Sequence, residues 1–145
     1  MKNRLVGLDT NVLIYYFEQN PQFGNASKGI FDKLSDQSLS AVTGSIAVVE
    51  ILAHRILSKK DAKEMEDKLF DVPNLIILEL NREIATEAAR IRREHKFSLP
   101  DSIQLATALD AKAQLFITND ENLKKFKELK IIMLSQFNNR LTDHL

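Results

Sequence analysis

The chain has no cysteine among its 145 residues. A disulfide framework and a thiolate metal site are therefore excluded, and the sequence suits a reducing compartment. Long hydrophobic runs are also missing. The longest apolar stretch, Ile46 to Ala53, is interrupted by Glu50, whereas a membrane span needs about 20 apolar residues. We therefore expect no membrane association and a cytoplasmic location.

An excess of charge of one sign is missing as well, because 20 basic and 20 acidic residues cancel. No global positive field indicates a nucleic-acid partner, although a local basic face can coexist with an acidic pocket. The N-terminus is basic, but the apolar run after it reaches Asp9 after four residues, too short for a signal-peptide core. At this length we expect a single domain, residues 1–145, that buries about two thirds of the unfolded chain's surface.

Short apolar runs alternate along the chain with helix-like stretches. Strands are expected at 5–8, 39–43, 75–80, 115–117 and 131–134. Helices are expected at 10–17, 25–37, 46–57, 61–71, 81–95 and 100–113, with a short one ending at 126. This alternation predicts an α/β fold, a sandwich in which helices flank a central parallel sheet of about five strands. The pattern alone does not give the strand order.

Four acidic residues occupy positions from which a carboxylate can face one edge of that sheet. They are Asp9 at a strand end, Glu50 within an apolar helix, Asp101 at a helix start and Asp120 just after a strand. Carboxylates gathered in this way repel one another, and a hard divalent cation is their usual partner. Oxygen ligands favour Mg²⁺ or Mn²⁺, whereas zinc would recruit His or Cys. Such a site supports phosphodiester hydrolysis.

The segments around these acids resemble, in order and spacing, the four acidic motifs of PIN-domain ribonucleases. They are LDTNVLIY (8–15), VVEIL (48–52), LPDSIQLATA (99–108) and FITND (116–120). Each segment alone is weakly specific, but the ordered set of four is much more specific. The resemblance covers nearly the whole chain, and a single PIN domain of this length looks most like the VapC-type toxins of prokaryotic toxin–antitoxin pairs.

This resemblance implies a PIN-like three-layer fold and a magnesium- or manganese-dependent endoribonuclease acting on RNA such as tRNA, rRNA or mRNA. It implies a homodimer and a small antitoxin whose peptide covers the acidic groove. It also implies that the metal is held, and water positioned, by Asp9, Glu50, Asp101 and Asp120. The polar positions that support these acids match Asn11 and Thr118.

Two other functions remain open at this point. The first is a phosphatase of the haloacid-dehalogenase kind, which is phosphorylated on an aspartate at the end of its first strand. Asp9 occupies such a position. That mechanism needs another acid two residues later, where this chain has Asn11. A noncatalytic module could instead bind RNA or a protein through the same groove.

Each acid also has a structural interpretation. Asp9 can cap the helix that follows, Asp101 can complement a helix dipole, and Asp120 can close an Asx-type turn. Glu50 lies between apolar neighbours, so we expect it to be partly buried. A buried carboxylate needs a partner, either a metal or a structural Arg or Lys.

Other polar residues carry weaker hypotheses. Glu79 follows a strand-like run and is a candidate fifth acid. His54 lies four residues after Glu50, the helical spacing of a ligand pair, but a surface position is the commoner interpretation of a lone histidine. A set of four basic residues is a candidate for contacts with phosphate, although such a set more often forms a solvated helix face. The residues are Arg90, Arg92, Arg93 and Lys96.

Overall fold

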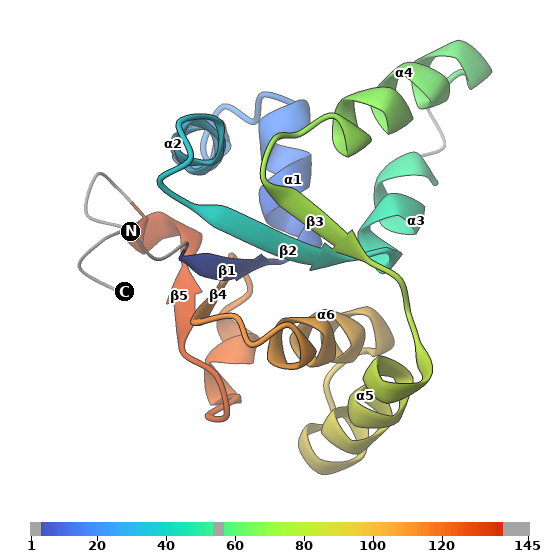
Figure 1. Cartoon of the computed structure of the whole chain (residues 1–145), viewed down its shortest axis with the longest axis vertical. Coiled ribbons are helices and arrows are strands. Elements are labelled where there is room, and N and C mark those ends of the chain that lie inside the picture. The colour runs from blue at the N-terminus through green and yellow to red at the C-terminus, as the bar shows by residue number, and fades with distance from the viewer. Residues whose placement is uncertain (1–3, 54–56, 138–145) are drawn as a thin grey trace.

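The computed structural model describes residues 4–53 and 57–137. In this part of the chain, five parallel strands form one sheet with the order β3-β2-β1-β4-β5 (Figure 1). The strands are β1 (Leu5–Leu8), β2 (Ser40–Gly44), β3 (Leu75–Leu78), β4 (Leu115–Thr118) and β5 (Ile131–Met133). The α/β fold with a parallel sheet of about five strands is therefore confirmed.

Helices cover both faces of the sheet and complete three layers. Figure 1 shows the first four helices on one face and the next two on the other. The first group is α1 (Thr10–Phe17), α2 (Gly24–Ser35), α3 (Ile46–Leu52) and α4 (Lys59–Phe70). The second group is α5 (Arg82–His95) and α6 (Leu99–Asp110), and two short 3-10 helices follow, η1 (Glu121–Lys125) and η2 (Leu134–Gln136).

The strands fit between these layers because their side chains alternate. Val6 and Leu8 of β1 belong to the core under α1–α4, whereas Gly7 faces the other side. A Cβ atom built on Gly7 would lie 2.8 Å from the Cβ of Ala108 and 2.8 Å from Cδ1 of Phe116. The missing side chain therefore lets α6 approach the centre of the sheet closely.

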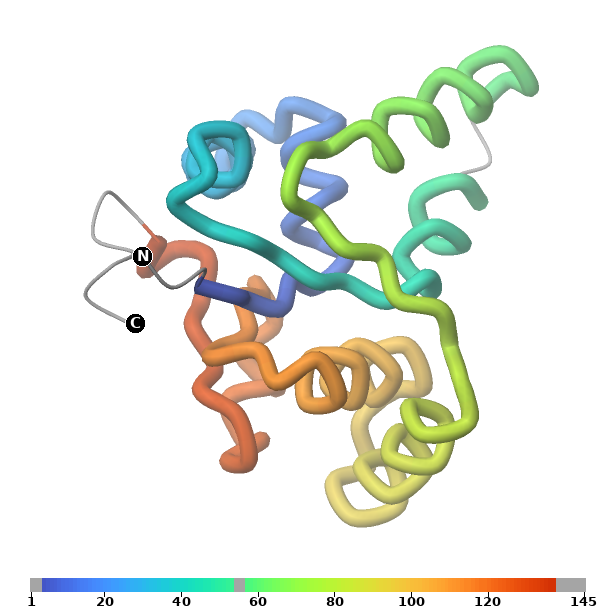
Figure 2. Tube along the Cα trace, in the orientation of Figure 1, coloured from blue at the N-terminus to red at the C-terminus, as the bar shows by residue number. Residues whose placement is uncertain are grey.

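The strand order reverses at β1. The chain passes from β1 outward through β2 and β3, and later returns to add β4 and β5 on the other side of β1 (Figure 2). Where the order reverses in this way, the loops after the neighbouring strands diverge and leave room for a ligand at their carboxyl ends. Asp9 follows β1 directly at this point.

Several elements are shorter than predicted, among them the third strand and the helix that follows the second strand. The strand expected at 75–80 ends at Leu78, because its pairing partner β2 ends at Gly44, directly opposite Leu78. The helix expected at 46–57 ends at Leu52, and His54 lies outside the described residues. Within the ranges 4–53 and 57–137, no helix combines the length and apolar character needed to cross a bilayer.

Candidate active site

Asp9 joins the central strand to the first helix. Its backbone N–H donates to the Ile117 carbonyl at 3.0 Å, so the residue still belongs to the pairing of β1 with β4. Its side-chain Oδ1 accepts from the Thr10 N–H at 2.9 Å and caps α1. The carboxylate is nevertheless almost fully buried, with 5% of the residue exposed. The structural interpretation of Asp9 as a cap is confirmed, but capping does not require such burial.

The second carboxylate oxygen of Asp9 contacts both residues expected to support it. The Thr118 hydroxyl donates to Oδ2 at 2.7 Å, and the same hydroxyl oxygen accepts the Asp120 N–H at 3.1 Å. The Asn11 amide nitrogen lies 3.5 Å from Oδ2, at the outer limit of a hydrogen bond. Thr118 therefore fixes Asp9 and the start of the Asp120 loop together.

Electrostatic interactions connect the four acids. The pKa of Asp9 is raised to about 7, mainly by burial and also by the charges of Asp101 and Glu50, against the hydrogen bonds from Thr118 and Thr10. Burial also raises the pKa of half-buried Asp101, against a hydrogen bond with Ser98, and the charge of Asp120 adds to the rise. The charges of Glu50, Asp101 and Asp120 thus each make ionisation of a neighbouring acid less favourable. These interactions couple Asp9 with Glu50 and Asp101, and Asp101 with Asp120; the four residues are called the acid centre here, although no three of them have ligand atoms that all lie within 4.8 Å of one another.

Asp101 and Asp120 also match their structural interpretations. Asp101 lies in the first turn of α6, where Ser98 accepts its N–H at 3.2 Å. Asp120 caps η1 by accepting the Asn122 N–H at 2.9 Å. The two carboxylates stand at the beginnings of different helices, and the charge of Asp120 still raises the pKa of Asp101, so capping is compatible with an interaction between the acids.

Glu50 is not partly buried as predicted; it is exposed. Helix α3 buries Ala47 and Ile51, whereas Val49 and Glu50 lie away from that face. Its partner is the Thr10 hydroxyl, which donates to Oε1 at 2.7 Å, rather than an Arg or Lys of the described chain. Glu50 therefore enters the acid centre from its solvent side.

Sequence reasoning missed Gln104, a polar residue of α6 that is 1% exposed and supports Thr10. Its Oε1 accepts the Gly44 N–H at 2.9 Å, so its amide nitrogen must face Thr10 and donates to that hydroxyl at 3.1 Å. The Thr10 proton is then left for Glu50. The available signal was a single glutamine within an otherwise apolar helix segment.

A divalent cation fits the chemistry of the acid centre. No Lys or Arg among the described residues forms an ion pair with any of its four acids. Beside Asp9, the buried Oδ1 of Asn11 has no hydrogen-bond partner. An oxygen-only donor set with an unused acceptor matches the preference of Mg²⁺ or Mn²⁺.

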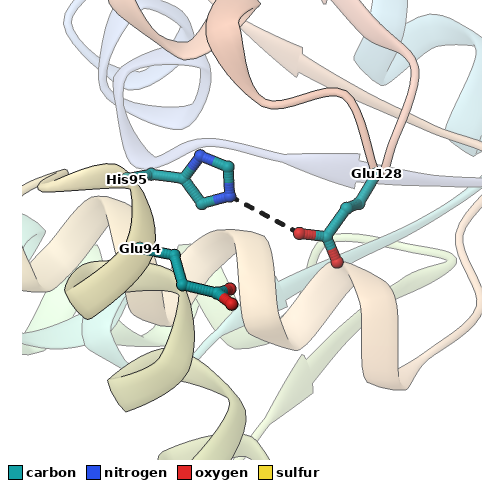
Figure 3. A group of neighbouring side chains, drawn as sticks. All are labelled: Glu94, His95 and Glu128. Atoms are coloured by element: carbon teal, nitrogen blue, oxygen red, sulfur yellow. Dashed lines mark ion pairs between the residues drawn. The ribbon is translucent and has the colours of Figure 1, made fainter.

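Within residues 4–53 and 57–137, one group of three His and acidic side chains has ligand atoms that all lie within 4.8 Å of one another. This group lies outside the acid centre. It consists of Glu94, His95 and Glu128 (Figure 3). Arg90 already bonds Glu94, Glu128 and also Glu87. This permanent cation lowers the pKa of Glu128. A metal would have to displace it, so we interpret the group as a structural clamp between α5 and the loop before β5.

The remaining candidates lie apart from the acid centre. Glu79 is exposed beyond the end of the edge strand β3. A cavity of about 730 Å³ is lined by residues of α1, α2 and the end of α4, including Tyr16, Phe17 and Lys28. It lies toward the C-terminal end of α1, whereas Asp9 caps the N-terminal end. We therefore do not connect this cavity with the acids.

Comparison with known families and structures agrees with the fold. A family model described as PIN domain matches residues 6–129. No curated protein matches the chain. Among solved structures, a toxin–antitoxin complex from Klebsiella pneumoniae is similar with a TM-score of 0.67 and 22% identity, covering 91% of this chain and 98% of that one.

Two further structures show similar likeness. VapBC2 from Rickettsia felis, bound to a DNA fragment from its promoter, has a TM-score of 0.69 and 17% identity, covering 89% of this chain and 98% of that one. DNA-bound VapBC from Salmonella typhimurium has a TM-score of 0.68 and 16% identity, covering 92% and 99%. At these identities the likeness demonstrates a shared fold.

Proposed function

Because the chain belongs to the PIN-domain family, we propose that it is a metal-dependent endoribonuclease that hydrolyses RNA phosphodiester bonds. The observation that carries the proposal is the burial of Asp9 among Asp101 and Glu50, which raises its pKa to about 7 without a compensating Lys or Arg in the described chain. Burying a carboxylate without a cationic partner costs stability, and a residue placed in this way is a candidate for a functional role.

We assign the residues of the acid centre to holding Mg²⁺ or Mn²⁺. When bound, the ion would supply a reactive hydroxide from water and stabilise the leaving oxygen. Asp9 and Asp101 would be direct ligands, Glu50 a ligand or the group that positions water, and Asp120 an outer ligand. Thr118 orients Asp9, and Thr10 directs its proton toward Glu50. Asn11 offers its unpartnered oxygen.

We further propose that the protein is the toxin of a type II toxin–antitoxin pair. The similar structures named above include complexes of a toxin with its antitoxin. Two exposed apolar residues adjoin the acids, Val49 at 61% exposure and Leu99 at 56%. A protein covering this place, an antitoxin segment or a second copy in a homodimer, would bury both. An antitoxin arginine could then pair with the acids.

The organisation as one domain and the cytoplasmic location complete the proposal. A single domain is supported by the family match over residues 6–129. The lack of cysteine suits a reducing compartment such as the cytoplasm, where the protein would encounter its RNA substrate.

The decisive experiment compares wild type with Asp101→Asn and with Asp110→Asn, an exposed acid at the other end of the same helix. Each is incubated with total RNA and defined tRNAs in Mg²⁺, in Mn²⁺ and in EDTA, and fragments are separated on a gel. We expect discrete fragments from wild type and Asp110→Asn with metal, and none from Asp101→Asn or in EDTA.

Cleavage that survives EDTA or the Asp101→Asn change would contradict the proposal. Hydrolysis of small phosphomonoesters with RNA left intact would indicate the phosphatase alternative. RNA binding without cleavage by folded, metal-loaded protein would indicate a noncatalytic module. Copurification of a small partner after coexpression with its neighbouring gene tests the toxin role separately.

A further inference from the structure

We propose that a basic rim beside the acid centre binds the phosphate backbone of single-stranded RNA. The basic rim consists of residues from the end of α5 and from the segment around η1: Arg92, Arg93, Lys96, Lys124, Lys125 and Lys127. The inference rests on the proposed nuclease function, because it names the surface that would hold the substrate of that centre.

Charge is concentrated in these two segments although the whole chain is neutral. Residues 90–96 and 121–130 together hold eight basic and three acidic residues, an excess of five positive charges. The rest of the chain carries the balancing negative charge. A local field of this kind attracts a polyanion even when the net charge is zero.

The two segments are adjacent in space although about 30 residues separate them. The His95 ring stacks on Phe97 at 5.4 Å and meets the edge of Phe126 at 5.2 Å. Arg90 bonds Glu128 at 2.7 Å, and His95 Nε2 lies 3.5 Å from the same carboxylate (Figure 3). The clamp therefore holds the end of α5 against the segment that follows η1.

Both segments also lead directly to the acid centre. Lys96 lies two residues before Ser98, which caps α6 and accepts the Asp101 N–H. On the other side, Asp120 caps η1, which carries Lys124 and Lys125. The two segments of the basic rim therefore adjoin Asp101 and Asp120, which interact electrostatically with one another.

Most charges of the basic rim are available to a ligand. Arg90 uses its own charge on Glu87, Glu94 and Glu128, which removes those acids as partners for their neighbours. Five residues of the basic rim are exposed and have no carboxylate partner in the described chain: Arg92, Arg93, Lys96, Lys125 and Lys127.

The remaining basic contacts are weak or leave the charge free. Lys124 has only a loose contact with Glu121, at 3.8 Å. Arg92 donates to the Phe97 carbonyl at 2.9 Å and remains exposed.

The chemistry of this surface favours phosphate over bases. Its aromatic rings, Phe97 and Phe126, are 2% and 1% exposed, so they offer no face on which a base could stack. Lysine and arginine contacts to phosphate position a nucleic acid without reading its sequence. The rim would therefore guide many RNA sequences toward the acids.

The test measures binding of a fluorescent 20-nucleotide single-stranded RNA by anisotropy, in EDTA to prevent cleavage, over a range of salt concentrations. Two double variants remove rim charges, Arg93→Gln with Lys96→Gln and Lys124→Gln with Lys125→Gln. The matched control removes two charges that line the 730 Å³ cavity, Lys28→Gln with Lys68→Gln.

For single strands, each lost phosphate contact lowers the slope of log K against log salt by about 0.7, so each rim variant should lose about 1.4 in slope and bind about 20-fold more weakly at 0.1 M salt. The control should bind like wild type. An equal loss in the control would overturn the proposal, because binding would then follow net charge alone.

A second readout separates this inference from the proposed function. If wild type cleaves RNA in Mg²⁺ but the rim variants bind RNA like wild type, the binding surface is wrong and the nuclease function stands. If wild type neither binds nor cleaves RNA, the nuclease function fails and the rim proposal fails with it.

Discussion

Replacing Asp9 with asparagine should stabilise the folded protein, most of all at alkaline pH. The folded chain raises the pKa of Asp9 from 3.8 to about 7, mainly through burial. The folded state therefore holds this proton more tightly than the unfolded state does. Stability associated with Asp9 is complete below the unfolded pKa and is lost as the pH rises toward and through 7.

The size of this effect follows from the pKa difference. Each pKa unit corresponds to about 1.4 kcal/mol, so the cost of ionising Asp9 in place grows from about 2 kcal/mol at pH 5 to about 4 kcal/mol at pH 8. Asparagine keeps an acceptor for the Thr10 N–H but turns an amide toward the Thr118 hydroxyl, a loss of about 1 kcal/mol. The variant should gain about 3 kcal/mol at pH 8, a rise in Tm on the order of 10 °C.

Urea unfolding of wild type and Asp9→Asn at pH 5 and pH 8, in EDTA, measures this difference directly. Asp110→Asn serves as the control for removing an exposed carboxylate. Added Mg²⁺ should narrow the gap at pH 8, because a ligand bound only by folded wild type stabilises it. An Asp9→Asn variant no more stable than wild type at pH 8 would refute the argument from burial.

Two further substitutions test the packing and polar contacts that position the centre. Gln104→Leu should lower the free energy of unfolding by about 1–3 kcal/mol, because the buried Gly44 N–H loses its acceptor; the same change at exposed Gln114 should stay within about 0.5 kcal/mol in urea unfolding. Gly7→Ala should destabilise by about 1–3 kcal/mol through overpacking, whereas Gly29→Ala, with open space in α2, should stabilise by about 0.5–1 kcal/mol; thermal unfolding that gives both glycine variants the same sign would contradict this account.

The strands and helix starts could be predicted because their signals are local. Asn81 accepts the Ile84 N–H at the start of α5, and Ile84, Ala88 and Ile91 are buried at helical spacing, which agrees with the helix expected at 81–95. The end of β3 could not be predicted in this way. It depends on where β2 stops, a partner more than 30 residues away.

The four acids remain a predicted site, and the structure couples them in pairs, Asp9 with Glu50 and Asp101, and Asp101 with Asp120. Asp9 was placed correctly because a strand end and a helix cap are both visible in sequence. The expectation that Glu50 is partly buried was wrong, because apolar residues adjacent in sequence on a helix do not share one face. The sequence pattern did not reveal that Gln104 pairs with Gly44, about 60 residues away.

The contacts of the acid centre explain why a chain without net charge suits the proposed RNA hydrolysis. Within the described residues, Asp9 and Glu50 receive hydrogen bonds from hydroxyl, amide and backbone donors and no ion pair from Lys or Arg. Neutral donors fix the carboxylates without cancelling their charge, so the attraction for a divalent cation is kept. A lysine within the centre would pair with an acid and compete with the metal. Positive charge set beside the centre, on the basic rim, can draw in a polyanion without that competition, and separating the two functions in this way requires no net charge.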